Sequence, residues 1–394
     1  MVQLVEFLMA GVLLGYAALM VNKDPLDTKE VKVLNEIFEE CKFKNSKGVL
    51  ANVHNFIKYE TYTEFYIDIP IGKSVSDLEK CIEAVETYFK NNASVEYKKN
   101  EVYLKLYTTH LKEFYAYRTH KVDKSKGLNV VLGMSRDGVI ERNLATEPHL
   151  SVVGATGGGK SVYVNSMLCQ LIENYSSDEL ELILLDLKGN ELNEYKDLYH
   201  TRYHTNSVEA AIEFFPVLRQ EMISRYQQLG NHRTIQSYNK ANPNHRMKYQ
   251  FIVVEECYSL IGNKEAWYVL GDILSKARAC GMHILLTTQR PTSDVIPAFV
   301  TTHLGIRVGL KTNKAQESKN AIEVIGLEKL TTPGSGIINF SGKYEYFQGF
   351  YISDEKIEQI TTKYRRPVET IQTIMSEEKQ PKKKSSMLYD YEED

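Results

Sequence analysis

The sequence predicts an α/β fold with a mostly parallel sheet, and three observations support this class. Short apolar segments that are typical of strands buried on both faces occur at 150–153, 181–185, 251–254 and 284–288. Longer segments with helical periodicity, such as 208–229 and 264–280, separate them. Polar or acidic residues follow most of these strands, at the edge of the sheet where α/β proteins place their ligand sites.

The first of these strands leads into a glycine-rich loop and then a helix. Residues 154–161 fit the pattern G-x-x-x-x-G-K-S without a mismatch, and a helical pattern begins at Val162. Glycines allow the backbone to curl with its N–H groups pointing at an anion, and the following helix adds its positive N-terminal dipole. A flexible turn before a helix is the alternative, but the flanking strand and the Lys-Ser pair favour a phosphate site. The predicted nucleotide contacts are Gly154, Ala155, Thr156, Gly157, Gly158, Gly159, Lys160, Ser161 and Val162.

Two acidic residues follow the third apolar strand. Glu255 and Glu256 come directly after 251–254, where the partner of a phosphate loop is expected. The first carboxylate would hold the water shell of Mg²⁺ together with the Ser161 hydroxyl, and the second would act as general base on the attacking water. Acids also follow strands as solvent-facing residues, but the upstream loop favours the catalytic interpretation.

Two further residues are candidates for chemistry at the γ-phosphate. Gln289 ends the fourth strand, where an amide can sense or polarise the attacking water. Arg278 lies near the end of 264–280 and cannot obviously reach the site of its own chain. We therefore consider it an arginine finger for a neighbouring subunit, because a planar cation suits the developing phosphoryl charge. A surface arginine at a helix end is an equal alternative.

Composition and charge set few limits on function. The chain has 394 residues, enough for two or three domains, and an ordinary hydrophobic content. Its net charge of −3 does not indicate a nucleic-acid-binding protein, although a ring-shaped motor needs only a local basic lining. The five cysteines show no metal-binding spacing and predict reduced cytosolic thiols: Cys41, Cys81, Cys169, Cys257 and Cys280.

The N-terminus carries an apolar segment. Residues 7–21 are uncharged, which predicts a membrane anchor within 1–22 that contacts the bilayer through residues 4–21. Gly11 and Gly15 have the small-x-x-x-small spacing of a helix-pairing face. Because a nucleotide site must face the cytosol, we expect a single-pass protein of the cell membrane whose remaining chain is cytoplasmic. A buried or partner-docking helix is the alternative.

Four segments follow the anchor. Residues 23–58 form a linker with a mainly helical pattern, and 59–127 predict a small α+β subdomain with no catalytic motif. The expected elements of that subdomain are strands at 64–69, 94–97 and 102–107 and a helix at 76–89. Residues 128–365 contain the phosphate site and begin with two strands around Arg136-Asp137-Gly138. Within them 232–248 is polar and predicted to be loop-rich, and residues 366–394 form a charged tail predicted to be disordered.

Several motifs together resemble the motor domain of the FtsK/SpoIIIE DNA-translocase family. They are Pro148-His149 before the glycine loop, Leu-Leu-Asp-Leu-Lys at 184–188, and the run 276–296, which contains Thr-Gln-Arg-Pro. The resemblance covers residues 128–353, and the preceding subdomain is similar to the one before the core in this family. It implies a RecA-like P-loop core with ATP and Mg²⁺ as cofactors, in a homohexameric ring that surrounds DNA.

The same resemblance implies roles for individual residues. Gly154, Gly159, Lys160 and Ser161 would bind the phosphates and Mg²⁺, and Glu255 and Glu256 would take the Walker B places. Arg278 would take the place of the trans arginine finger, and Gln289 that of the sensor. The family usually has aspartate where this chain has Glu255, and the extra methylene predicts altered Mg²⁺–water geometry and slower turnover. The residues after Ile352 are too few for the winged-helix domain of the family's chromosome pumps.

The leading hypothesis from the sequence is an ATP-driven DNA translocase that acts at the membrane in DNA transfer, in the conjugation of a mobile element. Short, singly anchored chains of this type resemble the coupling ATPases of Gram-positive mobile elements, and a relaxase would then be a partner. Two alternatives stay open: a protein-translocating secretion ATPase, and a nucleotide-binding scaffold that recruits a relaxase or replication protein. Lys311, Lys314, Lys319 and 232–248 are the candidate DNA contacts, and the sequence does not distinguish a single-stranded from a double-stranded track.

Overall fold

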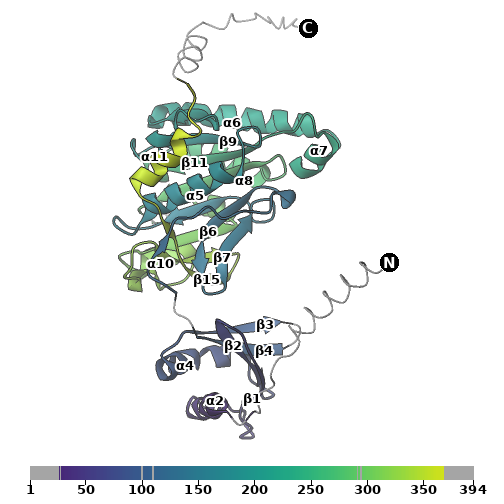
Figure 1. Cartoon of the computed structure of the whole chain (residues 1–394), viewed down its shortest axis with the longest axis vertical. Helices are drawn as coiled ribbons and strands as arrows, with labels where there is room; N and C mark the ends of the chain where they lie inside the picture. Colours follow the sequence, from purple (N-terminus) through teal and green to yellow (C-terminus); the bar gives the residue numbers. More distant parts are fainter. Residues whose placement is uncertain are drawn as a thin grey trace, which may run out of the picture. The chain divides into compact units, whose positions relative to one another are not determined.

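The computed structural model describes residues 26, 28–98, 101–108, 111–290, 292 and 295–367 (Figure 1). The chain divides into two compact units, Met1–Lys112 and Glu113–Asp394. The predicted membrane anchor and nearly all of the predicted disordered tail lie outside the described residues. Within the described ranges, no helix is both long and apolar enough to cross a bilayer.

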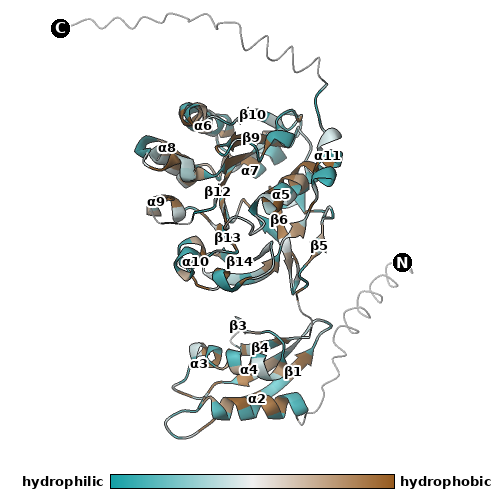
Figure 2. Cartoon of the chain, turned by 90° about the vertical axis from the view of Figure 1, so that its left-hand side faces the viewer, coloured by the Kyte–Doolittle hydropathy of each residue, from teal (hydrophilic) through white to brown (hydrophobic). Residues whose placement is uncertain are grey.

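The N-terminal unit packs helices against a four-stranded antiparallel sheet. Its elements are α2 (Lys29–Glu40), β1 (Asn52–Lys58), β2 (Tyr62–Asp68), α3 (Val75–Glu79), α4 (Ile82–Phe89), β3 (Ala93–Lys98) and β4 (Glu101–Tyr107). The strands lie in the order β1-β2-β4-β3. Phe65 and Leu104 of the central strands share a core with Leu34 and Phe38 of α2, and Figure 2 shows the mixed hydropathy of that helix. The three strands predicted for this region are confirmed.

The prediction that residues 23–58 are mainly helical is wrong after α2. Residues 52–58 form β1, which lies at the edge of the sheet. A register shift between Val53 and Asn55 interrupts the regular alternation of buried and exposed residues, and this hides the strand period in the sequence. The single helix predicted at 76–89 is divided into α3 and α4.

The C-terminal unit is built on a mixed sheet that has ten strands among the described residues. They lie in the order β10-β9-β11-β12-β8-β13-β14-β15-β6-β7. Their bounds are β6 (Asn129–Ser135), β7 (Gly138–Asn143), β8 (Leu150–Val153), β9 (Leu180–Asp186), β10 (Thr201–Thr205), β11 (Tyr249–Glu255), β12 (Met282–Thr288), β13 (Ile306–Leu310), β14 (Ser335–Phe340) and β15 (Lys343–Gln348). β5 (Tyr115–Ala116) and β16 (Phe350–Tyr351) form a separate parallel pair.

The predicted mostly parallel sheet is correct for one half and wrong for the other. Neighbouring strands from β10 to β13 run parallel, whereas neighbours from β13 to β7 run antiparallel. Tight turns at Arg136-Asp137 and Ser341-Gly342 connect β6 to β7 and β14 to β15 as hairpins, which forces antiparallel pairing. The first of these is the hairpin predicted around Arg136-Asp137-Gly138.

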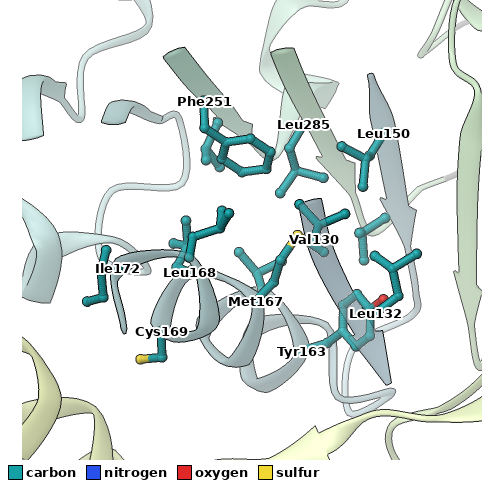
Figure 3. Close-up of a cluster of buried hydrophobic side chains, with 14 of the residues drawn as sticks. Val130, Leu132, Leu150, Tyr163, Met167, Leu168, Cys169, Ile172, Phe251 and Leu285 are labelled. Atoms are coloured by element: carbon teal, nitrogen blue, oxygen red, sulfur yellow. The ribbon is translucent and has the colours of Figure 1, made fainter. Parts of the chain in front are cut away.

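Helices cover both faces of the parallel half (Figure 1). The longer ones are α5 (Lys160–Asn174) and α11 (Asp354–Thr362) on one face, and α6 (Val208–Leu229) and α8 (Lys264–Lys276) on the other. Shorter ones are α7 (Ile235–Ala241), α9 (Ala298–Thr301) and α10 (Ala315–Ile322). Successive strand residues face opposite layers, so Phe251 packs in the core of α5 and Ile252 in that of α6 and α8. Figure 3 shows Met167 and Leu168 of α5 directed at Phe251 and Leu285.

Two segment predictions are corrected. Residues 113–127, predicted to belong to the small subdomain, are part of the C-terminal unit. The His120 N–H donates to Gln170 of α5 (3.0 Å), which fastens this segment to the helix. Within 232–248, predicted to be loop-rich, residues 235–241 form α7, because Thr234 caps the helix and Ile235 is buried.

Candidate nucleotide-binding site

The loop from Gly154 to Gly159 connects β8 to α5 at the edge where the parallel strands end. The Ala155 N–H donates to the Lys311 carbonyl (2.8 Å), and the Gly334 N–H donates to the Gly158 carbonyl (2.9 Å). Gly159 has a φ of 92°, and a Cβ there would lie 2.8 Å from the Gly334 nitrogen, so only glycine fits. No side chain caps the start of α5, which leaves its first N–H groups available to an anion. Ser161 and Val162 lie in the first turn of this helix.

Lys160 and Glu255 form a buried ion pair at this edge. Lys160 is 4% exposed and Glu255 is 1% exposed. The Thr287 hydroxyl of the neighbouring strand β12 donates to the other carboxylate oxygen of Glu255 (2.6 Å). Burying either charge alone would cost several kcal/mol, so each group needs the other inside the protein. A phosphate that entered the loop would compete with Glu255 for the Lys160 ammonium.

Glu256 and Gln289 meet at the adjoining ends of β11 and β12. Glu256 has a φ of 58°, a left-handed conformation that costs a non-glycine residue roughly 1–2 kcal/mol. Its carboxylate accepts hydrogen bonds from the Thr288 hydroxyl (3.0 Å) and the Gln289 N–H (3.2 Å), which hold it in that conformation. The Gln289 side chain accepts a hydrogen bond from the Thr156 hydroxyl (2.8 Å). The structure therefore brings the predicted base and the predicted sensor together with the phosphate loop.

Arg278 lies apart from these residues. It follows α8 and precedes β12, so it lies at the amino ends of the parallel strands. β12 has 7 residues, and at ~3.3 Å per residue the two edges of the sheet are separated by roughly 20 Å. Arg278 is exposed and lines a cavity of about 780 Å³ together with His303 and Arg307. A single copy of the chain does not combine Arg278 with Lys160.

Two histidines are buried at the same amino-end edge. His149 precedes β8, His283 is the second residue of β12, and both are 0% exposed. His149 Nδ1 accepts a hydrogen bond from the Ile284 N–H (3.0 Å), whereas neither ring nitrogen of His283 has a partner among the described residues. Burial lowers the pKa of His149 to about 3 and lowers the pKa of His283 well below its ordinary value. Both rings are therefore neutral at pH 7.

One residue at the site was not predicted from the sequence. Glu191 follows β9, and its carboxylate forms an ion pair with Lys188. Burial raises the pKa of Glu191, but the effects of Lys188, Ser161 and Lys160 outweigh it, so the pKa lies below its usual value. The sequence contained a signal for Glu191, because it lies with Asp186 and Lys188 in the segment after a buried strand, where α/β proteins place their ligand sites.

A sequence model of the FtsK/SpoIIIE family matches residues 110–323, more than half of the chain. The chain belongs to the FtsK/SpoIIIE family. Curated relatives include the DNA translocases FtsK of Caldanaerobacter subterraneus (32% identity over 245 residues), SftA of Bacillus subtilis (30% over 262) and FtsK of Clostridium tetani (27% over 366). These matches cover 59%, 64% and 85% of the chain, but only 34%, 27% and 49% of the relatives. The chain thus spans half or less of the length of these proteins.

Solved structures of other ATPases share the fold. The conjugation coupling protein TcpA of pCW3, in a structure with ATPγS, has a TM-score of 0.60 at 20% identity and matches 85% of this chain and 99% of its own. The cytoplasmic domain of the type VII secretion ATPase EccC of Thermomonospora curvata has a TM-score of 0.56 at 24% identity. It matches 66% of this chain and 33% of its own. These likenesses show a shared fold, and the family match shows the FtsK/SpoIIIE P-loop ATPase that the sequence predicted.

ATP and Mg²⁺ fit the residues of this FtsK/SpoIIIE site. The uncapped start of α5 and the curled loop suit a triphosphate, and Lys160 supplies a cation. Among the described residues, no group of three or more His, Cys, Asp or Glu side chains could hold a metal. Mg²⁺ usually keeps several waters and takes one or two carboxylates plus phosphate oxygens. Ser161 and Glu255 are the residues that would hold it, and the bound ion would neutralise phosphate charge.

Proposed function

We propose that this chain is an ATP-driven DNA translocase that acts at the membrane in DNA transfer, in the conjugation of a mobile element. Its membership of the FtsK/SpoIIIE family and its relatives named as DNA translocases support the motor activity. The observation that carries the proposal is the separation of Arg278 from the phosphate loop by the length of β12. Arg278 does not reach the site of its own chain, and a closed homohexameric ring would supply every site with Arg278 from a neighbouring copy.

This arrangement would couple ATP hydrolysis to the residues that contact DNA. Arg278 of one subunit would approach the γ-phosphate of the next, so the loss of that phosphate would change the interface. The phosphate loop is also fastened to the segment after β13 through the hydrogen bond between Ala155 and Lys311. Lys314 and Lys319 on that segment are exposed, and we assign them to the phosphate backbone of DNA, which binds basic side chains without regard to sequence.

The proposed role in conjugation is supported by the fold that the chain shares with TcpA and by how much of both chains that likeness covers. The match with TcpA, a conjugation coupling protein, covers 99% of the TcpA chain and 85% of this chain. The likeness therefore extends beyond the ATPase core. The apolar sequence at 7–21 supports a single membrane anchor through residues 4–21 with the motor in the cytoplasm. A relaxase, which would deliver the DNA, is the partner that this role requires.

The test is the ATPase rate of the full chain in detergent, measured with and without DNA and over a range of salt concentrations. We expect DNA to stimulate hydrolysis, and the stimulation to fall steeply with salt because phosphate contacts release counterions. Glu256→Gln removes the general base and should lower the rate by roughly 10²–10⁴-fold while ATP still binds. Glu265→Gln is the matched control, because Glu265 is exposed in the first turn of α8.

Other outcomes would contradict the proposal in different ways. A rate that DNA does not change, at normal basal turnover, would indicate a protein-translocating ATPase of the kind that EccC represents. Binding of ATP without any turnover would indicate a nucleotide-dependent scaffold, and would mean that glutamate at position 255 has removed the chemistry of the site. Single-stranded and duplex DNA compared in the same assay would identify the track.

A further inference from the structure

Lys160 and Glu255 bind each other in the structure, although each is expected to bind a ligand of the nucleotide site. Lys160 would bind the phosphates, and Glu255 would hold Mg²⁺ together with Ser161. The Lys160 ammonium donates a hydrogen bond to Oε1 of Glu255, and the two groups form an ion pair. Their side chains are 3% and 1% exposed, so solvent screens this pair very little. The pair therefore competes with both ligands for the groups that should hold them.

Glu255 has little else to neutralise its charge. The Thr287 hydroxyl donates to its Oε2 (2.6 Å), and the same hydroxyl oxygen accepts from the Lys160 ammonium (3.4 Å). Lys188 interacts electrostatically with Glu255, but the Lys188 ammonium pairs with Glu191 and its side chain is 42% exposed. If Lys160 turned to a phosphate, Glu255 would keep one printed hydrogen bond and lose the ion pair that it has among the described residues.

A nucleotide that binds without a metal ion would therefore cause two unfavourable changes. Glu255 would become a buried carboxylate without a paired cation, and removing one partner of a buried ion pair is strongly unfavourable. The phosphates would also bring further negative charge close to that carboxylate, and like charges repel. Mg²⁺ offsets both changes, because it supplies positive charge to a carboxylate and to phosphate oxygens at the same time.

We propose that the pair of Lys160 and Glu255 makes nucleotide binding depend on Mg²⁺, so that the site takes the Mg²⁺ complex of ATP and binds the free triphosphate weakly. This inference rests on the proposed ATP-dependent function. It gives Glu255 a second role, as the group that holds Lys160 until a metal ion takes its place. Because coupling between two ligands is reciprocal, the nucleotide raises the affinity for Mg²⁺ by the same factor.

The experiment measures the Kd of a fluorescent, non-hydrolysable ATP analogue for the full chain in detergent, in EDTA and in MgCl₂, without DNA. For the wild type we expect the Kd in EDTA to be about 100-fold above that in MgCl₂. Glu255→Gln keeps an acceptor for the Thr287 hydroxyl but removes the charge that holds Lys160. Its Kd in EDTA should therefore fall about tenfold or more below that of the wild type.

This result separates the proposal from a role of Glu255 in metal binding alone. A glutamate that only helped to hold Mg²⁺ would, when replaced by glutamine, weaken binding in MgCl₂ and leave binding in EDTA unchanged. Glu265→Gln is the matched control, because Glu265 is exposed in the first turn of α8. Both of its Kd values should equal those of the wild type.

A second variant keeps the negative charge, in case Glu255→Gln does not fold. Glu255→Asp sets the carboxylate back by one methylene, which lengthens its contact with Lys160 but leaves a charge for Mg²⁺. Its Kd in EDTA should also fall, with little change in MgCl₂. Unchanged Kd values in EDTA for these variants would overturn the proposal, and so would equal wild-type Kd values in EDTA and MgCl₂. Because no DNA is present, a failure of DNA to stimulate hydrolysis would leave these Kd values unaffected, and the two proposals fail separately.

Discussion

The two ends of the parallel strands in the C-terminal unit treat buried ionisable groups in opposite ways. At the carboxyl ends, Lys160 and Glu255 are almost fully buried and form an ion pair that Thr287 completes. At the amino ends, His149 and His283 are equally buried, and burial, reinforced by the positive charge of Arg278 rather than offset by an acidic partner, lowers the pKa of both. The same degree of burial thus gives a charged pair at one end and neutral rings at the other, and the presence of a partner makes the difference.

This difference shows how each edge of one sheet can supply part of a site that two copies of the chain complete together. The carboxyl-end edge contains a buried ammonium that can exchange its carboxylate for a phosphate. At the amino-end edge the two histidines are neutral, the buried Arg225 donates to the carbonyl groups of Cys280 and Lys248, and Arg278 is exposed beside a cavity. If copies of the chain pack with one edge against the other, the exposed arginine meets the phosphate loop of the next copy.

The largest effect is expected when the amino-end edge loses Arg278. Arg278→Ala should lower kcat by roughly 10³-fold or more, because an arginine finger supplied in trans stabilises the charge of the transition state. Nucleotide binding should change little, since Arg278 is distant from the loop of its own chain. ATP turnover and fluorescent nucleotide binding on the same samples measure the two quantities, and Lys264→Ala, an exposed cation at the start of α8, is the control.

Mixing variants distinguishes a role in trans from damage to the chain's own site. Arg278→Ala subunits keep an intact phosphate loop, and Lys160→Ala subunits keep an intact arginine, so mixed assemblies contain some complete sites. Activity should therefore appear in the mixture although each variant alone is inactive. A mixture as inactive as its components would refute the pairing of the two edges.

The parts of this comparison that could be predicted from the sequence are those with a local pattern. The strand at 150–153 and the helix at 208–229 have the predicted bounds, because the first is a short buried run that ends at the glycine loop and the second keeps the helical spacing of its buried residues. Arg278 was predicted to lie out of reach of its own loop, and the chain order alone places it before the strand that leads to Gln289.

The contacts between distant residues could not be predicted in this way. The bond between Lys160 and Glu255 depends on β12 lying between β8 and β11, and the order of strands in a sheet is not written in any local pattern. Glu191 was missed for the same reason, since its loop lies beside the end of β11 only through the pairing of β9 with β11. The β1 strand was missed because its register shift removes the period of two.

A smaller effect is expected when the pairing at the carboxyl ends is weakened without removing a charge. Thr287 is 0% exposed, donates to Glu255 (2.6 Å) and accepts from the Glu256 N–H (3.0 Å). Thr287→Val keeps the shape but leaves both groups unsatisfied, so the free energy of unfolding should fall by about 1–3 kcal/mol. Urea denaturation measures it, with Thr302→Val at an exposed hydroxyl as control. Equal losses in the two variants would show that the pairing is not what stabilises this end.

An effect of similar size concerns the neutral histidines, and it depends on pH. The pKa of His283 is lower in the folded chain than its ordinary value of about 6.5. Below about pH 6.5 the unfolded chain therefore binds a proton at this ring that the folded chain does not bind. Stability should therefore fall as pH drops below about 6.5, by about 2 kcal/mol at pH 5 for this one ring. Leucine at this position cannot take up a proton, so His283→Leu should lose about 2 kcal/mol less than the wild type between pH 7.5 and pH 5. Urea titrations at the two pH values measure this difference. His245→Leu, at an exposed histidine, should keep the pH dependence of the wild type. If His283→Leu also kept that dependence, the His283 ring would already bind a proton in the folded chain. The two ends of the sheet would then not differ as described.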